Sequence, residues 1–130
     1  TRSEIISKSV VANGGKSIYR GLVYVARGAR NARSHIQCDS VILDDKSTSI
    51  TIPHNQVFEP TAEVTHEASV GQISEDYLFY MQSRGFTEQE ARNLLILGFI
   101  GDLTRELPFE MAGILNRVIQ MEFSEVGGVG

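Results

Sequence analysis

The apolar residues of this 130-residue chain change their spacing once, across the stretch from Glu63 to Gly85. Before this stretch they occur in short runs rich in β-branched residues, separated by polar residues and without a helical period. After it they recur at intervals of three and four residues, which is typical of amphipathic helices. A chain of this length forms one domain or a small pair of packed subdomains. Because the spacing of the apolar residues changes once, we expect a β part followed by an α part.

Short strands are expected in the first part, because the centres of the apolar runs between Ile5 and Val64 lie mostly about 5–9 residues apart. Such strands can form a sandwich, a barrel or a solenoid, and composition does not choose among these. No tandem motif is clear enough to define a repeat, although the spacing is compatible with a β-helix, whose open end would need a cap, more chain or a partner. Turn signals separate the runs, at Asn13-Gly14-Gly15, Gly28, Asn31, Asp44-Asp45 and Pro53 to Asn55.

Local signals in the second part predict helix ends. We expect a first helix from about Glu75 to Arg84, because Ser74 can cap its start and Gly85 suits the left-handed residue that follows a helix. The residues at 124–130 end in Gly-Gly-Val-Gly and are expected to fray.

Two more helices are expected after the first. A capping box over Thr87-Glu88-Gln89-Glu90 predicts the start of the second, and Gly98 and Gly101 weaken it enough to predict a break near Ile100. Pro108 suits the first position of the third helix. The apolar stripe of that helix is Met111, Ile114, Leu115, Val118 and Ile119.

Charge is distributed unevenly, although the formal net charge is only −4. Residues 1–46 hold eight Lys/Arg against four Asp/Glu, and residues 47–130 hold four against twelve. Such asymmetry can mark a nucleic-acid face, which Arg20, Arg27, Arg30 and Arg33 would form. Solvated strands and turns explain the same residues, and no aromatic residue is interleaved between Arg27 and Arg33. We therefore expect no nucleic-acid partner.

Membrane spans, signal peptides and disulfides each indicate a class of protein, and the sequence shows none of the three. No apolar run approaches the roughly 20 residues that cross a bilayer, and no basic-then-apolar segment indicates a signal peptide, so no membrane partner is expected. The lone cysteine, Cys38, excludes an internal disulfide and fits a reducing compartment, so we expect a cytoplasmic protein.

Few side chains carry obvious site chemistry. A free cysteine such as Cys38 is more often a small buried hydrophobe than a nucleophile or ligand. His66 and Glu67, which are adjacent in the sequence, could supply an imidazole and a carboxylate for a metal, but adjacent strand residues point to opposite faces, so at most one joins a given site without a bulge. A Cys/His hydrolase would need Cys38, His35 or His66, and an orienting Asp or Asn. No oxyanion-hole or nucleophile-elbow signature accompanies them, and we expect no enzyme.

Several short motifs follow one another in a specific order. They are Gln37-Cys38-Asp39-Ser40 with Val41-Ile42-Leu43, Thr65-His66-Glu67-Ala68-Ser69-Val70-Gly71, Glu75-Asp76-Tyr77-Leu78-Phe79-Tyr80, Ser83-Arg84-Gly85 with Gly98-Phe99-Ile100, and Glu106-Leu107-Pro108-Phe109-Glu110. In this order and spacing they resemble the SufB/SufD family of iron–sulfur cluster assembly proteins. The resemblance covers roughly Asn31 to Val126 and is weaker before that.

The resemblance implies an architecture and partners. It implies a right-handed parallel β-helix of stacked short strands over residues 1–72, a helical domain over 73–123 and a flexible tail over 124–130. SufB and SufD are longer proteins, so the chain is similar to their C-terminal third. The family pairs as a dimer, SufB with SufD or with itself, through the β-helix, and docks the ABC-type ATPase SufC on the helical domain. Exposed residues among Phe86, Leu97, Phe99 and Phe109 are the candidate ATPase contacts.

The resemblance also implies site residues. It makes Cys38 and His66 metal ligands and adds Glu67 to the residues that bind a transient iron–sulfur cluster at the subunit interface. Glu67 favours SufB, since SufD sequences often have glycine there, whereas Thr65 departs from the glutamate that many SufB sequences carry. Thiolate and imidazole both bind such clusters, and one cysteine cannot supply four ligands, so a second subunit would complete the site. The implied function is a non-catalytic scaffold; the alternatives are an interaction module without a cluster role and a thiol enzyme.

Overall fold

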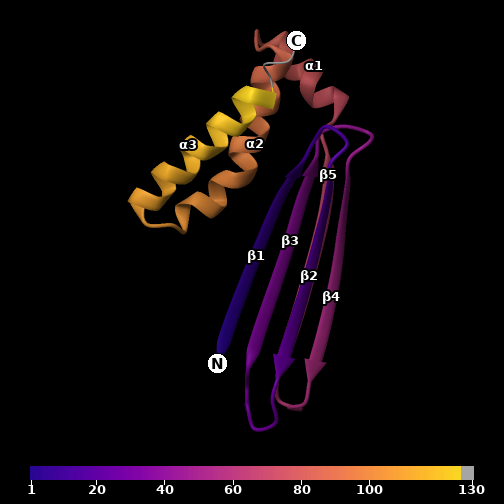
Figure 1. Cartoon of the computed structure of the whole chain (residues 1–130), viewed down its shortest axis with the longest axis vertical. Helices are drawn as coiled ribbons and strands as arrows, with labels where there is room; N and C mark the ends of the chain where they lie inside the picture. The colour runs from indigo at the N-terminus through magenta and orange to yellow at the C-terminus, as the bar shows by residue number, and fades with distance from the viewer. Residues whose placement is uncertain (127–130) are drawn as a thin grey trace. The chain divides into compact units, whose positions relative to one another are not determined.

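The structure, a computed structural model, describes residues 1–126 and divides into two compact units, Thr1–Ile73 and Ser74–Gly130 (Figure 1). The first unit contains the strands and the second the helices. The strands are β1 (Arg2–Val11), β2 (Lys16–Val25), β3 (Arg33–Ile42), β4 (Thr48–Val57) and β5 (Glu63–Gln72). The helices are α1 (Glu75–Ser83), α2 (Glu88–Arg105) and α3 (Phe109–Val126).

Successive strands alternate between two sheets, and every pairing is parallel. One sheet has the order β1-β3-β5 and the other pairs β2 with β4. Arg2 pairs with Arg33, an offset of 31 residues, and Arg33 pairs with Glu63, an offset of 30. Lys16 pairs with Thr48, an offset of 32. Each pair of strands with its two turns therefore forms a structural repeat that no sequence motif marks.

The strands are longer than the apolar runs predict. Each has ten residues, so two neighbouring runs, such as Ile5–Ile6 and Val10–Val11, belong to one strand. The expected turn at Pro53 to Asn55 is wrong, because these residues lie inside β4. Proline lacks the N–H that a central strand must donate, but among the described strands β4 pairs with β2 alone and tolerates it.

The two sheets pack through alternate residues of their strands. In β3 every second residue from Ser34 to Ser40 is buried, and the residues between them are more exposed. Ile36 and Cys38 from this strand form one apolar cluster with Val23 and Val25 of β2. The face that carries these residues is called the inner face below, and the opposite one the outer face.

Hydroxyl groups share the inner face with the apolar cluster. The Oγ atoms of Ser9 and Ser40 lie 2.7 Å apart, and Ser40 Oγ lies 2.7 Å from Ser49 Oγ of the other sheet. Ser3 donates to Ser34 over 3.0 Å. Among the described side chains that are not exposed, no buried nitrogen or oxygen lacks a hydrogen-bond partner. Polar residues are therefore compatible with the interior, since each hydroxyl is paired.

Turns between the strands are held to the turns one repeat away. The N–H of Gly14 donates to Asp44, and that of Gly28 donates to Glu59, across 30 and 31 residues of chain. The hydroxyl of Ser47, followed by backbone N–H groups, lowers the pKa of Asp44 to about 2, because these bonds favour the charged carboxylate. Asn13, Gly14, Gly28 and Asn31 have positive φ, which explains the asparagines and glycines predicted as turns.

The helix signals of α1 are confirmed. Ser74 Oγ accepts the N–H of Tyr77, and Gly85 follows the helix with a φ of 96°. The N–H of Phe86 donates to the carbonyl of Met81, which satisfies one of the free carbonyl groups at the helix end.

The second helix differs from expectation. Its capping box, Thr87 with Glu90, is present, but the predicted break near Ile100 is wrong because α2 continues to Arg105. Each glycine costs about 1 kcal/mol relative to alanine, and packing outweighs such a cost. Ala91 and Ile96 are fully buried, which indicates where this packing occurs.

The third helix begins one residue later than expected, with the carbonyl of Pro108 accepting its first bond from Ala112. Leu115 is half-buried and Ile119 is buried, whereas a second row of apolar side chains on the same helix is exposed. The helix runs to Val126, past the expected start of the tail, and residues 127–130 lie outside the described residues. No helix in the described range 1–126 is both long and apolar enough to cross a membrane. The exposed row is Met111, Ile114, Val118 and Met121.

Replacing Gly98 or Gly101 with alanine should stabilise α2. An added Cβ at either position meets no atom within 4 Å, so the backbone restriction is gained without a clash. We expect a gain of about 1 kcal/mol per site, measured in the full-length protein as a several-fold slowing of hydrogen exchange at α2 amides. Gly85→Ala is the control and should destabilise, since its φ of 96° strains any residue with a side chain. Faster exchange in the helix variants would show that these glycines are needed for close packing.

Candidate functional site

Cys38 lies on the inner face of β3, the middle strand of its sheet. Its side chain is 3% exposed and packs in the apolar cluster. The continuous apolar run that follows Cys38 in the sequence does not predict which way its side chain points. The burial of Ser34, Ile36 and Ser40 shows that it points inward, since alternate strand residues share a face.

The surroundings of Cys38 keep its thiol protonated. Burial, and to a smaller extent the negative charge of Asp39, raise the pKa of Cys38 above its ordinary value. An activated cysteine nucleophile needs the opposite, a lowered pKa and an electropositive, accessible setting. The thiol is therefore poorly nucleophilic in this structure.

His66 is the imidazole next to this thiol. It lies on β5, in register with Ile36, so that its side chain shares the inner face with Cys38. The distance from Cys38 Sγ to His66 Nε2 is 3.6 Å. A protonated thiol can donate to an unprotonated Nε2 at this separation. The pairing register therefore brings together two metal-ligand types that are 28 residues apart in sequence.

The separation also fits a metal held by both atoms. A tetrahedral ion with bonds of about 2.3 Å to sulfur and about 2.0 Å to nitrogen places these donors roughly 3.5 Å apart. Within residues 1–126, no group of three or more His, Cys, Asp or Glu side chains is arranged to hold a metal ion. The pair thus supplies two donors, and any further ligands must come from outside this group.

Glu67 is placed on the opposite face. It is in register with Gln37, whose face is the outer one, and it is exposed. The structure does not bring Glu67 to the Cys38–His66 pair, as the alternation of neighbouring strand residues led us to expect. Its predicted role in cluster binding stays a prediction.

The other two histidines do not approach the thiol. His35 lies on the outer face of β3, where its Nδ1 is 2.8 Å from Thr65 Oγ1. His54 is exposed and belongs to β4, not to a turn as its position after Pro53 indicated. Of the histidines weighed for a Cys/His pair, His66 is the one that the register selects.

The pair lies at the last strand of its sheet. β5 is bonded to β3 on one side, and the described residues provide no strand on its other side. Beyond His66, the inner-face residues Ala68 and Val70 are exposed. His66 thus lies on the edge strand of the sheet and Cys38 on the strand next to it. The unpaired backbone groups of such an edge can accept a strand from another chain.

Comparison with known proteins places the chain in a family. Residues 1–99 match the family model described as "SUF system FeS cluster assembly, SufBD core domain". The chain belongs to the SufBD family. This confirms the resemblance drawn from the motifs.

The SufBD relatives are much longer than this chain. It is 50% identical, over all 130 residues, to iron–sulfur cluster assembly SufBD family proteins of Staphylococcus haemolyticus, Staphylococcus epidermidis and Staphylococcus aureus. The chain spans 28% of the length of each of these proteins.

Alkylation tests the protonated state of Cys38. Near neutral pH, iodoacetamide should modify Cys38 at least about tenfold more slowly in the folded protein than after unfolding in urea, because burial and the raised pKa both lower the reactive thiolate. The modified peptide is quantified by mass spectrometry across a pH series. The alkylation rate of the folded protein should begin to rise at a higher pH than the alkylation rate of the unfolded protein. Equal rates near neutrality would contradict this description and favour a thiol enzyme.

Proposed function

We propose that this SufBD chain is part of a scaffold subunit for iron–sulfur cluster assembly. In this proposal Cys38 and His66 bind one iron of the nascent cluster, which is the cargo of the protein. The observation that carries the proposal is the 3.6 Å separation of Cys38 Sγ and His66 Nε2 on the inner face. Sulfur and imidazole nitrogen are both ligands of iron–sulfur centres, and the separation matches two donors on one tetrahedral metal.

A scaffold needs a site that is incomplete by itself. Two protein ligands hold a cluster less firmly than the usual four, which suits a protein that must pass the cluster on. We propose that a second subunit, like or unlike, supplies the remaining ligands across the free edge of β5. The position of His66 on that edge strand supports this arrangement.

We further propose that the β unit is the end of a parallel β-helix. Strands that alternate between two sheets and pair in parallel with offsets of 30 to 32 residues are what successive turns of such a helix produce. Earlier turns would lie in the part of the full-length protein that this chain does not span. Under this proposal β1 and β2 also have strand partners in the full-length protein.

A third part of the proposal concerns the helical unit, which would dock a SufC-like ATPase. Large exposed apolar surfaces mark partner sites, and the exposed row of α3, Met111 to Met121, is such a surface. Phe109, at the start of the helix, is 93% exposed, and Phe86 and Leu97 are exposed as well. Phe99 is half-buried, so it is the weakest of the four predicted contacts.

Substitution of the two proposed ligands tests the scaffold role. In the full-length protein with its ATPase, Cys38→Ala and His66→Gln should each reduce reconstituted cluster to about a tenth or less, because each removes a metal donor. Visible absorption and Mössbauer spectra measure the cluster, and co-purification shows that the complex is intact. His54→Gln, on an exposed strand position, is the matched control and should leave the cluster unchanged.

The same variants separate the alternatives. If Cys38→Ala keeps both the complex and a normal cluster yield, the chain is an interaction module without a cluster role. If Cys38 is instead alkylated rapidly in the folded, unsubstituted protein, and Cys38→Ala abolishes a hydrolytic or transferase activity, the chain is a thiol enzyme. Either outcome rules out the proposed ligand role.

A charged residue in the exposed row of α3 tests ATPase docking. Ile114→Glu or Val118→Glu should weaken binding of the SufC-like ATPase at least about tenfold, since a charge would be buried in an apolar contact. Gln120→Glu adds the same charge on the opposite side of the same helix and is the control. Affinity is measured by titration of the full-length protein with the ATPase. Unchanged affinity in both row variants would place the docking surface elsewhere.

A further inference from the structure

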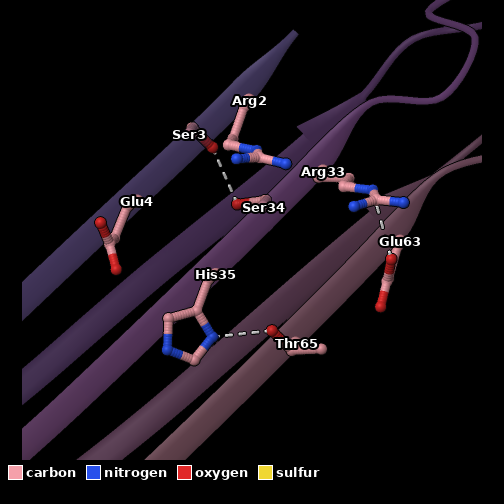
Figure 2. A pocket seen from close by; sticks show the side chains of 8 residues that line it. All are labelled: Arg2, Ser3, Glu4, Arg33, Ser34, His35, Glu63 and Thr65. Carbon is pink, nitrogen blue, oxygen red and sulfur yellow. Dashed lines mark hydrogen bonds and ion pairs between the residues drawn. The ribbon is translucent and has the colours of Figure 1, made fainter.

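A second polar site lies on the first unit, away from the Cys38–His66 pair. It is an open cavity of about 360 Å³ at the beginning of β1, β3 and β5 (Figure 2). Strand pairing places two rows of outer-face residues side by side here, with the inner-face serines Ser3 and Ser34 in the row between them, so the composition of the cavity follows from the register. The cavity is lined by Arg2, Ser3, Glu4, Arg33, Ser34, His35, Glu63 and Thr65.

Two arginines stand next to each other in the first row. Arg2 and Arg33 are paired residues of neighbouring parallel strands, and both guanidinium groups extend the same way in Figure 2. Like charges on directly paired residues repel each other, so this arrangement is unfavourable unless an anion lies close by.

The protein's own carboxylates compensate this pair incompletely. Glu63 Oε2 is 3.5 Å from Arg33 Nε, and both side chains are more than half exposed, at 61% and 64%, so the ion pair is weak. Arg2 forms no ion pair or hydrogen bond through its side chain within the described residues. The carboxylate of Glu4 points away from both guanidinium groups in Figure 2.

His35 adds a fixed imidazole in the second row. Thr65 Oγ1 lies 2.8 Å from its Nδ1, a contact that orients the ring. In Figure 2 the ring nitrogen that is not bonded to Thr65 points away from both guanidinium groups, so the anion donors of this cavity are the two guanidinium forks. Tetrahedral oxyanions suit such a set, because a guanidinium group binds two of their oxygens at once and the remaining oxygens reach a second donor.

We propose that Arg2 and Arg33 bind a phosphate-class oxyanion in this cavity, with His35 beside it. A dianion neutralises both guanidinium charges, which the single carboxylate of Glu63 does not. The ligand is inorganic phosphate or the phosphate group of a small monoester; both present the same oxygens to the arginines. This site is independent of the proposed cluster role, since the side chains of Arg2, Arg33 and His35 belong to the outer face and the site shares no residue with the Cys38–His66 pair.

Calorimetric titration of the full-length protein with inorganic phosphate, and separately with glycerol 3-phosphate, tests the proposal at constant ionic strength. Saturable binding of either ligand is the expected result, and the tighter of the two identifies the source of the phosphate. Arg2→Gln and Arg33→Gln should each weaken phosphate binding at least about tenfold, because each substitution removes charge-assisted hydrogen bonds. Arg20→Gln removes the same charge from an exposed position in the other sheet and should have no effect.

A variant with the opposite effect guards against misfolding as an explanation. Glu63→Gln removes the carboxylate that competes for Arg33, so it should tighten phosphate binding severalfold. Absence of saturable binding by both ligands would overturn the proposal. So would an equal loss in Arg20→Gln, or weaker binding in Glu63→Gln.

Discussion

Parallel pairing at a nearly constant offset is the constraint on which the β unit depends. Because β1, β3 and β5 pair without a shift, each residue is fixed beside the residue one repeat away, and its face is fixed with it. This single condition places Cys38 beside His66, pairs the serines of the interior and joins the turns through Asp44 and Glu59. It also aligns Arg2 with Arg33 on the outer face.

The two faces of one sheet consequently have different chemistry. The inner face combines a small apolar cluster with paired hydroxyls, and it holds a protonated thiol against an imidazole. The outer face carries charged and amide side chains in rows, among them the hydrogen-bonded Asp39. A proposed metal-binding pair and a proposed anion site can therefore occupy the same three strands without interfering, since the backbone separates them.

Sequence reasoning succeeded where the signal is local. Ser74, the Thr87–Glu90 box and Gly85 predict helix ends because capping depends on residues within one turn. It failed on strand length, since inward serines such as Ser9 and Ser40 interrupt the apolar alternation and their pairing is visible only across repeats. The Cys38–His66 contact had the same obstacle: the residue types were evident, but their proximity required the register.

The fixed alternation has a consequence for how such a chain can vary in length. One residue inserted within β3 ahead of Gln37 would turn the sulfur of Cys38 outward and bring Gln37 into the interior, because the faces of a strand exchange with every step. An insertion between Asp45 and Lys46, in an exposed turn, would leave both faces as they are. Gains and losses of residues among members of the family should therefore accumulate between strands and avoid their interiors.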